Sequence, residues 1–462
     1  MHRNHERATP QRHSQVIQRQ LRAREAMDFF NVLTGPQWLQ VTEAHLPEHR
    51  ERLYPPTVTL SMFLQQVLSA DGSCQRAVNG WAASRAAEGL SAQSVRTGGY
   101  CRARARLPAR MVRALTEHSG RMLSERSARG WCWRGRRVKL LDGTGVSMPD
   151  TAANQAAFPQ PRSQAVGVGF PLARLSTLIC LASGAVLEAG IDAHEGKGHS
   201  ELDCSRRLLS ALQSGDLLLA DALYANYFLI AELRGAGVDV LFAQHGSRRT
   251  DFRAGTHLGP TDHVVRWQKP DHCPAWMSRA RYEAAPAELV LREVRVGGKV
   301  LVSSLLDARQ VSKAALAKLY AQRWHVELDL RCIKTTLGMD VLRCRTPAMI
   351  ETELWAHLLA YNVIRLLMAQ AAAAHGTEPR CLSFKHTVQL WSEWRARTLG
   401  GALLPDLHRL FALIAQPRVA QRPHRCEPRA RKRRPKSFPW LKVHRHVARS
   451  RNPALPNWRR VK

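Results

Sequence analysis

The amino-acid sequence predicts an α/β protein in which a mixed sheet carries helices on both faces. Three observations predict this class. Between residues 138 and 305, short apolar runs alternate with amphipathic stretches, as strands alternate with helices in α/β folds. The chain before that region, from residue 26 to about 127, has helical periodicity. The chain after residue 416 is strongly basic, so we expect a basic C-terminal region outside the sheet.

Composition limits the partners and the location of the chain. Its 462 residues are 45% hydrophobic, enough for one large core or for two to three domains. The formal net charge of +32 favours a polyanionic partner, most simply nucleic acid, over a ribosomal-type or membrane-surface role. The ten cysteines form no C-x-x-C pair, so neither a zinc module nor a disulfide framework is indicated. No apolar run approaches the roughly 18 residues that span a bilayer. We therefore expect a cytoplasmic protein with no membrane partner.

The first 130 residues are rich in arginine. Residues 1–25 are polar and basic and are expected to form a disordered arm, whereas residues 26–130 are expected to form a helical DNA-binding domain. Arg102 and Arg104 lie beside Tyr100 in a stretch that suits a small helical unit contacting DNA. A solvated basic helix face is the alternative interpretation.

Residues 131–376 contain the predicted sheet. An apolar strand over residues 138–141 ends in Asp142, and the sequence Gly-Thr-Gly that follows predicts a turn. Two apolar runs at 175–181 and 185–191 flank a Ser-Gly pair and predict a β-hairpin. The next predicted elements are a helix over 201–212, a strand over 216–220 that ends in Asp221, a helix near 224–233 and a strand over 238–243.

Residues 246–296 interrupt this alternation. They are polar and rich in Gly, Pro, Arg and His, and they are interpreted as a β-rich insertion. A core strand resumes at 299–305, and helices are predicted over 312–337 and 350–374. The rest of the chain is divided into a C-terminal helical region and a basic tail, at 377–417 and 418–462.

Four polar residues share one stripe of the helix predicted at 312–337. They lie at offsets 0, +3, +7 and +14, and at about 100° per residue these offsets project onto one side of a helix: Tyr320, Arg323, Glu327 and Lys334. Apolar residues flank the stripe, with Val326, Leu330, Ile333 and Leu337 on one side and Trp324 and Leu328 on the other. His325 and Asp329 project to the opposite face. Unpaired charge is costly among apolar residues, so the four either neutralise one another in the core or line a site for a charged ligand. We favour the site.

Three carboxylates can join this stripe. Asp142 and Asp221 each follow an apolar strand, and the ends of strands are where α/β sheets place catalytic groups. With Glu327 from the helix they would form the oxygen-rich environment that Mg²⁺ or Mn²⁺ prefers. Two such ions about 4 Å apart can activate a nucleophile and stabilise a leaving oxygen in phosphoryl transfer. For either aspartate taken alone, a role as a turn residue is the alternative.

The order and spacing of these residues resemble the DDE transposases of the insertion-sequence type-four family. The likeness is carried by the spacing Y-(2)-R-(3)-E-(6)-K, preceded by LLDGTGVSMPD and LLLADALYANY, and it covers about residues 136–374. The resemblance implies a ribonuclease-H-like catalytic core, interrupted by a β-insertion between the second aspartate and the glutamate. It also implies cut-and-paste movement of a DNA element, with a homodimer in the synaptic complex.

The resemblance also implies roles for individual residues. Asp142, Asp221 and Glu327 would hold two Mg²⁺ or Mn²⁺ ions, and the phosphates of the transposon end would be gripped by Tyr320, Arg323 and Lys334. Family members cleave through a hairpin with a base flipped out, and Trp324 matches an aromatic residue found beside that site. Some relatives hold the flipped base with a tryptophan in the preceding strand, which residues 298–305 lack. Trp267 or Trp276 from the insertion is the candidate to replace it.

The sequence thus predicts a transposase that nicks double-stranded DNA at terminal inverted repeats, resolves a hairpin and joins the 3′ end to target DNA. A bacterial, nucleoid-associated protein is expected. The first alternative is a related metal-dependent endonuclease without strand transfer. The second is a non-catalytic DNA-binding descendant of a mobile element, although all three carboxylates and the stripe are intact.

Overall fold

The structure is a computed structural model of the 462-residue chain. It describes residues 7–8, 36–46, 49–50, 53–91, 93–196, 200–398, 407–416, 419 and 441–451. The arm expected at 1–25 lies outside the described residues except for β1 (Arg7–Ala8), which pairs with β2 (His49–Arg50). Most of the tail expected at 418–462 lies outside them too, apart from a short segment that includes α17 (Arg445–Ser450).

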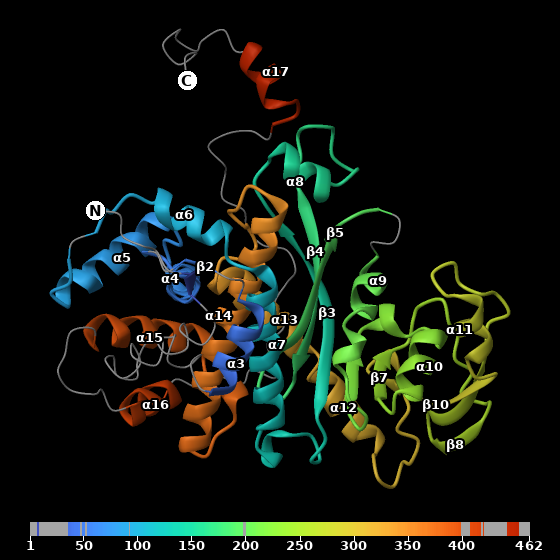
Figure 1. The fold of residues 1–462 in the computed structure, drawn as a ribbon. Coiled ribbons are helices and arrows are strands. Elements are labelled where there is room, and N and C mark those ends of the chain that lie inside the picture. Colours follow the sequence, from blue (N-terminus) through green and yellow to red (C-terminus); the bar gives the residue numbers. More distant parts are fainter. Residues whose placement is uncertain are drawn as a thin grey trace.

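A nine-stranded mixed sheet forms the centre of the protein (Figure 1). Its strands, in spatial order, are β5 (Val186–Ala193), β4 (Leu172–Cys180), β3 (Val138–Ser147), β6 (Leu217–Ala220), β7 (Asp239–Ala243), β11 (Lys299–Ser303), β10 (Glu288–Val296), β9 (Asp262–Gln268) and β8 (Thr256–Gly259). β6 pairs in parallel with both β3 and β7, and the other neighbours are antiparallel. The predicted α/β class with a mixed sheet is confirmed.

β3 is longer than the strand predicted at 138–141. The turn expected after Asp142 was wrong, because β3 continues to Ser147. β6 ends at Ala220, but β4 keeps pairing with β3 as far as the pair Ser147–Leu172. The partner strand, not the Gly-Thr-Gly sequence, therefore decides where β3 ends.

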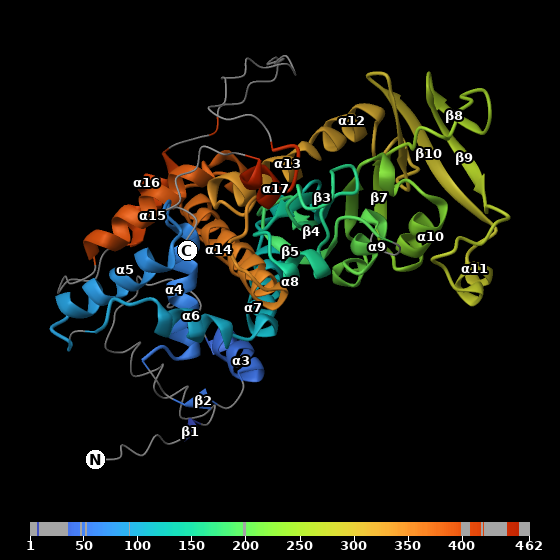
Figure 2. The ribbon, with the colours of Figure 1, turned by 90° about the horizontal axis from the view of Figure 1, so that it is seen from above.

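Strands of the predicted insertion continue the same sheet. β10 pairs with β11, and β9 and β8 follow outward, so they extend the sheet away from β3 (Figure 2). Apolar side chains of this part, including Trp267 and Tyr282, share a core with Phe228 of α10 (Tyr227–Gly235). A short helix, α11 (Arg279–Ala284), lies between β9 and β10.

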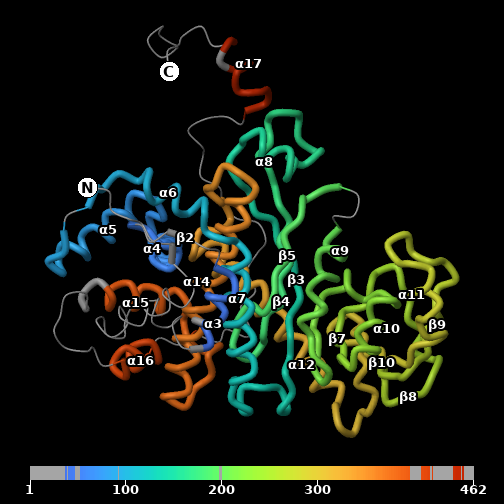
Figure 3. The backbone as a smooth tube through the Cα atoms, viewed as in Figure 1, coloured from blue at the N-terminus to red at the C-terminus, as the bar shows by residue number. Residues whose placement is uncertain are grey.

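Helices cover both faces of the sheet. In the trace of Figure 3, α7 (Ala109–Glu125) and α14 (Pro347–Ala374) lie on one side of β3–β5, and α9 (Glu201–Arg206) and α10 on the other. Gly120 of α7 touches β5 so closely that a Cβ there would lie 2.0 Å from the carbonyl oxygen of Val186. This contact seats α7 on the sheet.

Four described helices precede α7; the first two share a core with α14 and the sheet, and the last two form a smaller core with Met62 of the second. In chain order these helices are α3 (Pro36–His45), α4 (Pro56–Leu68), α5 (Cys74–Ala87) and α6 (Gly98–Ala105). Leu64 of α4, Leu115 of α7 and Leu358 of α14 belong to one apolar cluster that also includes Leu140 of β3. Two further helices, α15 (Phe384–Thr398) and α16 (Leu407–Ala415), pack against α14. Within the described part of the chain, no helix combines the length and the apolar character needed to cross a membrane.

The helix predicted at 312–337 is a chain of three segments. α12 (Lys313–Ala321) is followed by α13 (Trp324–Arg331) and by a π-helical turn, η4 (Cys332–Thr336). Backbone hydrogen bonds between residues three apart join α12 to α13; for example, the N–H of Arg323 donates to the carbonyl of Tyr320 at 3.0 Å. The prediction of a single regular helix over 312–337 was therefore wrong, although all three segments are helical. A π-helical turn inside a helix is often found at a functional site.

Candidate active site

The two strand-associated aspartates lie on neighbouring parallel strands. Leu140 of β3 is in register with Leu219 of β6, so Asp142 and Asp221 each come two residues later. Oδ1 of Asp142 accepts the backbone N–H of Gly143 at 2.8 Å. Asp221 caps the turn η3 (Ala222–Tyr224), and its Oδ1 accepts the backbone N–H of Leu223 at 2.8 Å. Local backbone bonds thus fix one oxygen of each carboxylate.

Asp142 lies in a partly desolvated, acidic environment. Burial raises the pKa of Asp142 to about 6, against the lowering effects of the Gly143 N–H and of the Arg323 guanidinium. The carboxylates of Asp221 and Glu201 raise this pKa further. Asp142 therefore lies near two other acidic groups, an arrangement in which a cation stabilises the ionised form.

Arg323 joins the first aspartate to the glutamate. Its Nη1 lies 3.3 Å from Oδ2 of Asp142, and its Nη2 donates to Oε1 of Glu327 at 2.7 Å. Burial raises the pKa of Tyr320, and Asp221 adds to that effect, so this phenol lies near the second aspartate. The structure brings together five residues named from the sequence, on β3, after β6 and along α12–α13.

Lys334, in η4, contacts β3 at a point further along the strand than Asp142. Its Nζ donates to the carbonyl of Gly145 at 2.8 Å and to Oγ1 of Thr144 at 3.1 Å. The ammonium group of Lys334 is therefore held against β3, two to three residues beyond Asp142. Because both acceptors are neutral, these contacts leave the positive charge of Lys334 without a neutralising carboxylate.

The donor set fits a hard divalent cation in its chemistry. Asp142, Asp221 and Glu327 supply carboxylate oxygens, which Mg²⁺ and Mn²⁺ prefer. In the described residues, however, no group of three or more His, Cys, Asp or Glu side chains is close enough to hold an ion. The guanidinium of Arg323 lies between Asp142 and Glu327 and supplies the positive charge instead. Metal binding by all three carboxylates would thus require Arg323 to move.

Sequence reasoning missed the network on the other face of α13. Asp329, placed opposite the stripe and given no role, is fully buried. Both its oxygens accept Nη1 of Arg380, at 2.7 and 2.8 Å, and Oδ1 also accepts Nη2 of Arg365 at 2.5 Å. Arg380 donates as well to the carbonyl of Leu181, next to the β4–β5 turn. These bonds fasten α13 to α14 and to the sheet behind Glu327.

The two arginines named for DNA contact have different environments. Arg102 is exposed on α6. Arg104 is only 6% exposed, and its guanidinium stacks 3.9 Å from the ring centre of Phe63. It also donates to the sulfur atoms of Cys74 and Cys344 at 3.0 and 3.1 Å. In this conformation Arg104 is a packing residue that cannot reach a phosphate, because its donors face the interior.

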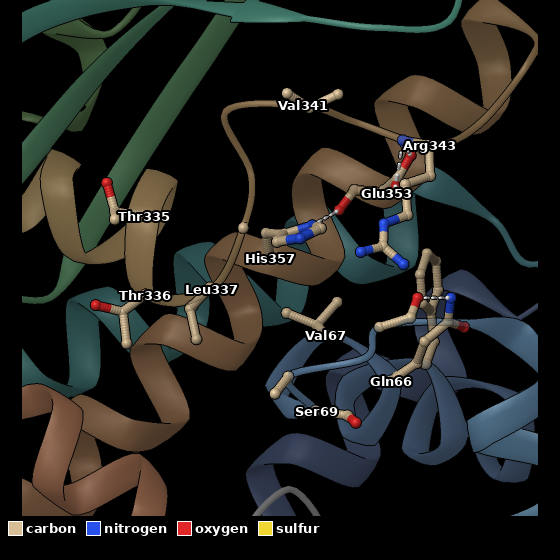
Figure 4. A pocket seen from close by; sticks show the side chains of 14 residues that line it. Gln66, Val67, Ser69, Thr335, Thr336, Leu337, Val341, Arg343, Glu353 and His357 are labelled. Carbon is tan, nitrogen blue, oxygen red and sulfur yellow. Dashed lines mark hydrogen bonds between the residues drawn. The ribbon is translucent and has the colours of Figure 1, made fainter. Parts of the chain in front are cut away.

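The segment after η4 is fastened to the N-terminal helices. A hollow of about 120 Å³ lies between α4 and this segment. Figure 4 shows Arg343, Glu353 and His357 among the side chains that line it. The buried carboxylate of Glu353 accepts the backbone N–H of Arg343 at 2.9 and 3.0 Å, and Arg343 donates to the carbonyl of Asp71 at 2.8 Å. The chain that leaves the candidate site is therefore tied directly to the N-terminal helices.

The tryptophans of the insertion are not available for a flipped base in this conformation. Trp267 is 3% exposed and donates its indole N–H to Glu293 at 2.7 Å. The ring of Trp276 is covered by the guanidinium of Arg206 at 3.3 Å. Trp324, at the start of α13, is 57% exposed and presents an aromatic surface beside Arg323.

Comparison with known proteins identifies the family. The profile of the transposase DDE domain matches residues 133–363, which is half of the chain. The transposase InsG for insertion sequence element IS4 of Escherichia coli (strain K12) is 29% identical over 320 residues, covering 66% of this chain and 70% of InsG. Among solved structures, the piggyBac transposase synaptic complex with hairpin DNA aligns with a TM-score of 0.38 and 11% identity, over 89% of this chain and 93% of that one.

The matched region begins before β3 and ends within α14, so it contains Asp142, Asp221, Glu327 and the stripe. Transposases of this family use divalent metal ions to cut DNA. The chain belongs to the DDE transposases of the IS4 type, and it is a DNA transposase that cleaves DNA by phosphoryl transfer.

Proposed function

We propose that Asp142, Asp221 and Glu327 hold two Mg²⁺ or Mn²⁺ ions at which this transposase cleaves DNA. The observation that carries the proposal is the meeting of Asp142 and Glu327 around Arg323, at 3.3 Å and 2.7 Å, with Asp221 at the matching position after the neighbouring parallel strand. When bound, such ions activate a water or a 3′-hydroxyl and stabilise the leaving oxygen. In the free protein Arg323 offsets the carboxylate charge, and a DNA phosphate offers it another partner.

The residues of the stripe position the DNA end. Arg323 and Lys334 point a guanidinium and an ammonium group toward β3, and such groups bind phosphates well. Tyr320 adds a phenol that can donate to a phosphate oxygen. In the helical N-terminal region, the exposed Arg102 is proposed to contact DNA. These contacts supply affinity and orientation but no sequence information.

The proposed reaction is cut-and-paste transposition at terminal inverted repeats. The 3′-hydroxyl released by the first cut attacks the opposite strand and forms a hairpin, which is then opened and joined to target DNA. Exposed Trp324 is proposed to stack on the base that the hairpin forces out, because an aromatic face can hold any base. The alternative of an endonuclease without strand transfer uses the same carboxylates and stops before joining.

The proposed architecture assigns these steps to parts of the chain. A ribonuclease-H-like core at 131–376, with the insertion at 246–296, carries the chemistry. Its support is the order β5-β4-β3-β6-β7, with the carboxylates on β3, after β6 and on α13. A DNA-binding domain at 26–130 precedes it, and the region at 377–417 and the basic tail at 418–462 follow. A homodimer that pairs two DNA ends, in the bacterial nucleoid, completes the proposal.

A joining assay tests the proposed reaction. Purified full-length protein is incubated with duplexes carrying the element's own terminal repeats, a supercoiled target plasmid and Mg²⁺. Hairpin ends and end-joined plasmid are expected. Cut ends without hairpins or joined plasmid would support the endonuclease, and bound but uncut DNA with either Mg²⁺ or Mn²⁺ would support the non-catalytic binder.

A further inference from the structure

Glu201, the first residue of α9, lies against the backbone of the strand that carries Asp142. A Cβ built on Gly143 would lie 2.8 Å from both Cδ and Oε1 of Glu201, so only glycine leaves room for this carboxylate. Neighbouring residues of a strand point to opposite faces. Glu201 therefore approaches from the face opposite the one on which Asp142 contacts Arg323 of α13.

Tyr224 connects Glu201 with the second aspartate. Its ring is fully buried, and its hydroxyl donates to Oε1 of Glu201 at 3.0 Å. The same hydroxyl lies 3.0 Å from Oγ of Ser205. Because a carboxylate can only accept, the tyrosine proton goes to Glu201 and Ser205 donates to the tyrosine oxygen. Tyr224 is also the last residue of the η3 turn that Asp221 caps.

We infer that Glu201 is a positioning residue of the transposase reaction: by holding Tyr224, it fixes the turn after Asp221 against the strand backbone at Asp142. Glu201 thereby sets the separation of the two aspartates on which a shared metal site depends. The inference rests on the assignment of Asp142 and Asp221 proposed above.

Two observations favour this role over a simple surface ion pair. Among the described residues, Arg174 pairs with Glu201 at 3.7 Å from Oε2, which is farther than the tyrosine hydroxyl lies from Oε1. The carboxylate of Glu201 also lies against the backbone of Gly143, the residue next to Asp142, where a Cβ would come within 2.8 Å of it. Residues that orient metal ligands in this way typically change metal affinity or activity about 10–100-fold when they are replaced.

The test compares Glu201→Ala, Glu201→Gln, Tyr224→Phe and the double variant Glu201→Ala/Tyr224→Phe in the full chain. Glu201→Ala and Tyr224→Phe should each slow single-turnover cleavage of a terminal-repeat duplex by about 10–100-fold. The double variant should be no slower than the worse single variant, because both changes remove the same bond. Glu201→Gln keeps an oxygen that accepts from Tyr224, so its rate should stay within about threefold of the unchanged protein.

A second readout separates positioning from general damage. Mn²⁺ binding to the protein–DNA complex, followed by calorimetry, should weaken in Glu201→Ala and Tyr224→Phe but not in Glu201→Gln. The affinity for the DNA end should not change in any variant. Glu232→Ala is the matched control: Glu232 is 25% exposed, against 24% for Glu201, and it contacts one arginine, Arg281, at 2.7 Å. It should behave as the unchanged protein.

Three results would overturn the inference: normal cleavage by Glu201→Ala, equal losses in Glu201→Gln and Glu201→Ala, or full activity in Tyr224→Phe. If Glu201→Ala does not fold, the pair Glu201→Gln and Tyr224→Phe decides by the same criteria. Asp142→Ala and Asp221→Ala are run in parallel. Normal cleavage by either of these would remove the site assignment itself, which is a different failure from that of Glu201.

Discussion

Replacing Lys334 by alanine should leave the protein folded while impairing its chemistry on DNA ends. The ammonium group donates to the carbonyl of Gly145 at 2.8 Å and to Oγ1 of Thr144 at 3.1 Å. Neither acceptor is charged, so the substitution leaves no carboxylate without its partner. This differs from a stripe whose charges neutralise one another in the core.

A phosphate-binding role for Lys334 and a role in a buried ion pair predict different losses of unfolding free energy. A hydrogen bond contributes about 0.5–1.5 kcal/mol net, and water can reach this half-buried site, so losing both bonds should cost about 1–2 kcal/mol of unfolding free energy. Breaking a buried ion pair would cost about 3–5 kcal/mol. If Lys334 grips a phosphate, losing that charged contact removes about 1.5–3 kcal/mol, or roughly 10–100-fold in hairpin formation.

A urea melt and a hairpin assay on one preparation decide between them. Lys334→Ala should lose about 1–2 kcal/mol of stability and form hairpins 10–100-fold more slowly. Lys318→Ala, at an exposed position of α12, is the matched control and should be normal in both. The reasoning would be refuted by a stability loss above about 3 kcal/mol with normal hairpin rates in the folded fraction.

Three further predictions concern the tail, the buried network and Arg323. Deleting residues 418–462 removes 16 Lys and Arg and one acidic residue, so log affinity for DNA should fall less steeply with log salt; an unchanged slope would show that the tail does not contact DNA. Asp329→Ala leaves buried Arg365 and half-buried Arg380 without their carboxylate and should cost about 3–5 kcal/mol in urea unfolding. A cost below about 1 kcal/mol would contradict this. Arg323→Gln removes the cation between two of the carboxylates, so calorimetry should show tighter Mn²⁺ binding without DNA; weaker or equal binding would show that Arg323 does not compete with metal.

Local patterns were enough to predict the class of fold and most elements. The strands expected at 175–181 and 185–191 are β4 and β5, and the helix expected at 350–374 is the main part of α14. These features depend on hydrophobic periodicity, which is read within a few residues. The end of β3 could not be read in this way, because pairing with β4 extends the strand through Gly143 and Gly145.

Long-range partners account for what the sequence did not reveal at the site. Asp329 is neutralised by arginines 36 and 51 residues further along the chain, and no local pattern points to them. Arg104 lies in an arginine-rich stretch, yet packing against Phe63 and Cys344 draws its side chain inward. An aspartate on the face of the helix turned away from the stripe was the available signal for the buried network.

Cleavage by the three carboxylate variants tests the central claim most directly. Asp142→Ala, Asp221→Ala and Glu327→Ala are each compared with the unchanged protein on a terminal-repeat duplex, in Mg²⁺, Mn²⁺ or Ca²⁺. Because Lys and Arg contacts with phosphates supply most of the affinity, each variant should bind the end nearly normally and fail to cut it. Ca²⁺ should permit binding without cleavage by the unchanged protein. Cleavage at a near-normal rate by any one of the three variants would contradict the assignment of the active site.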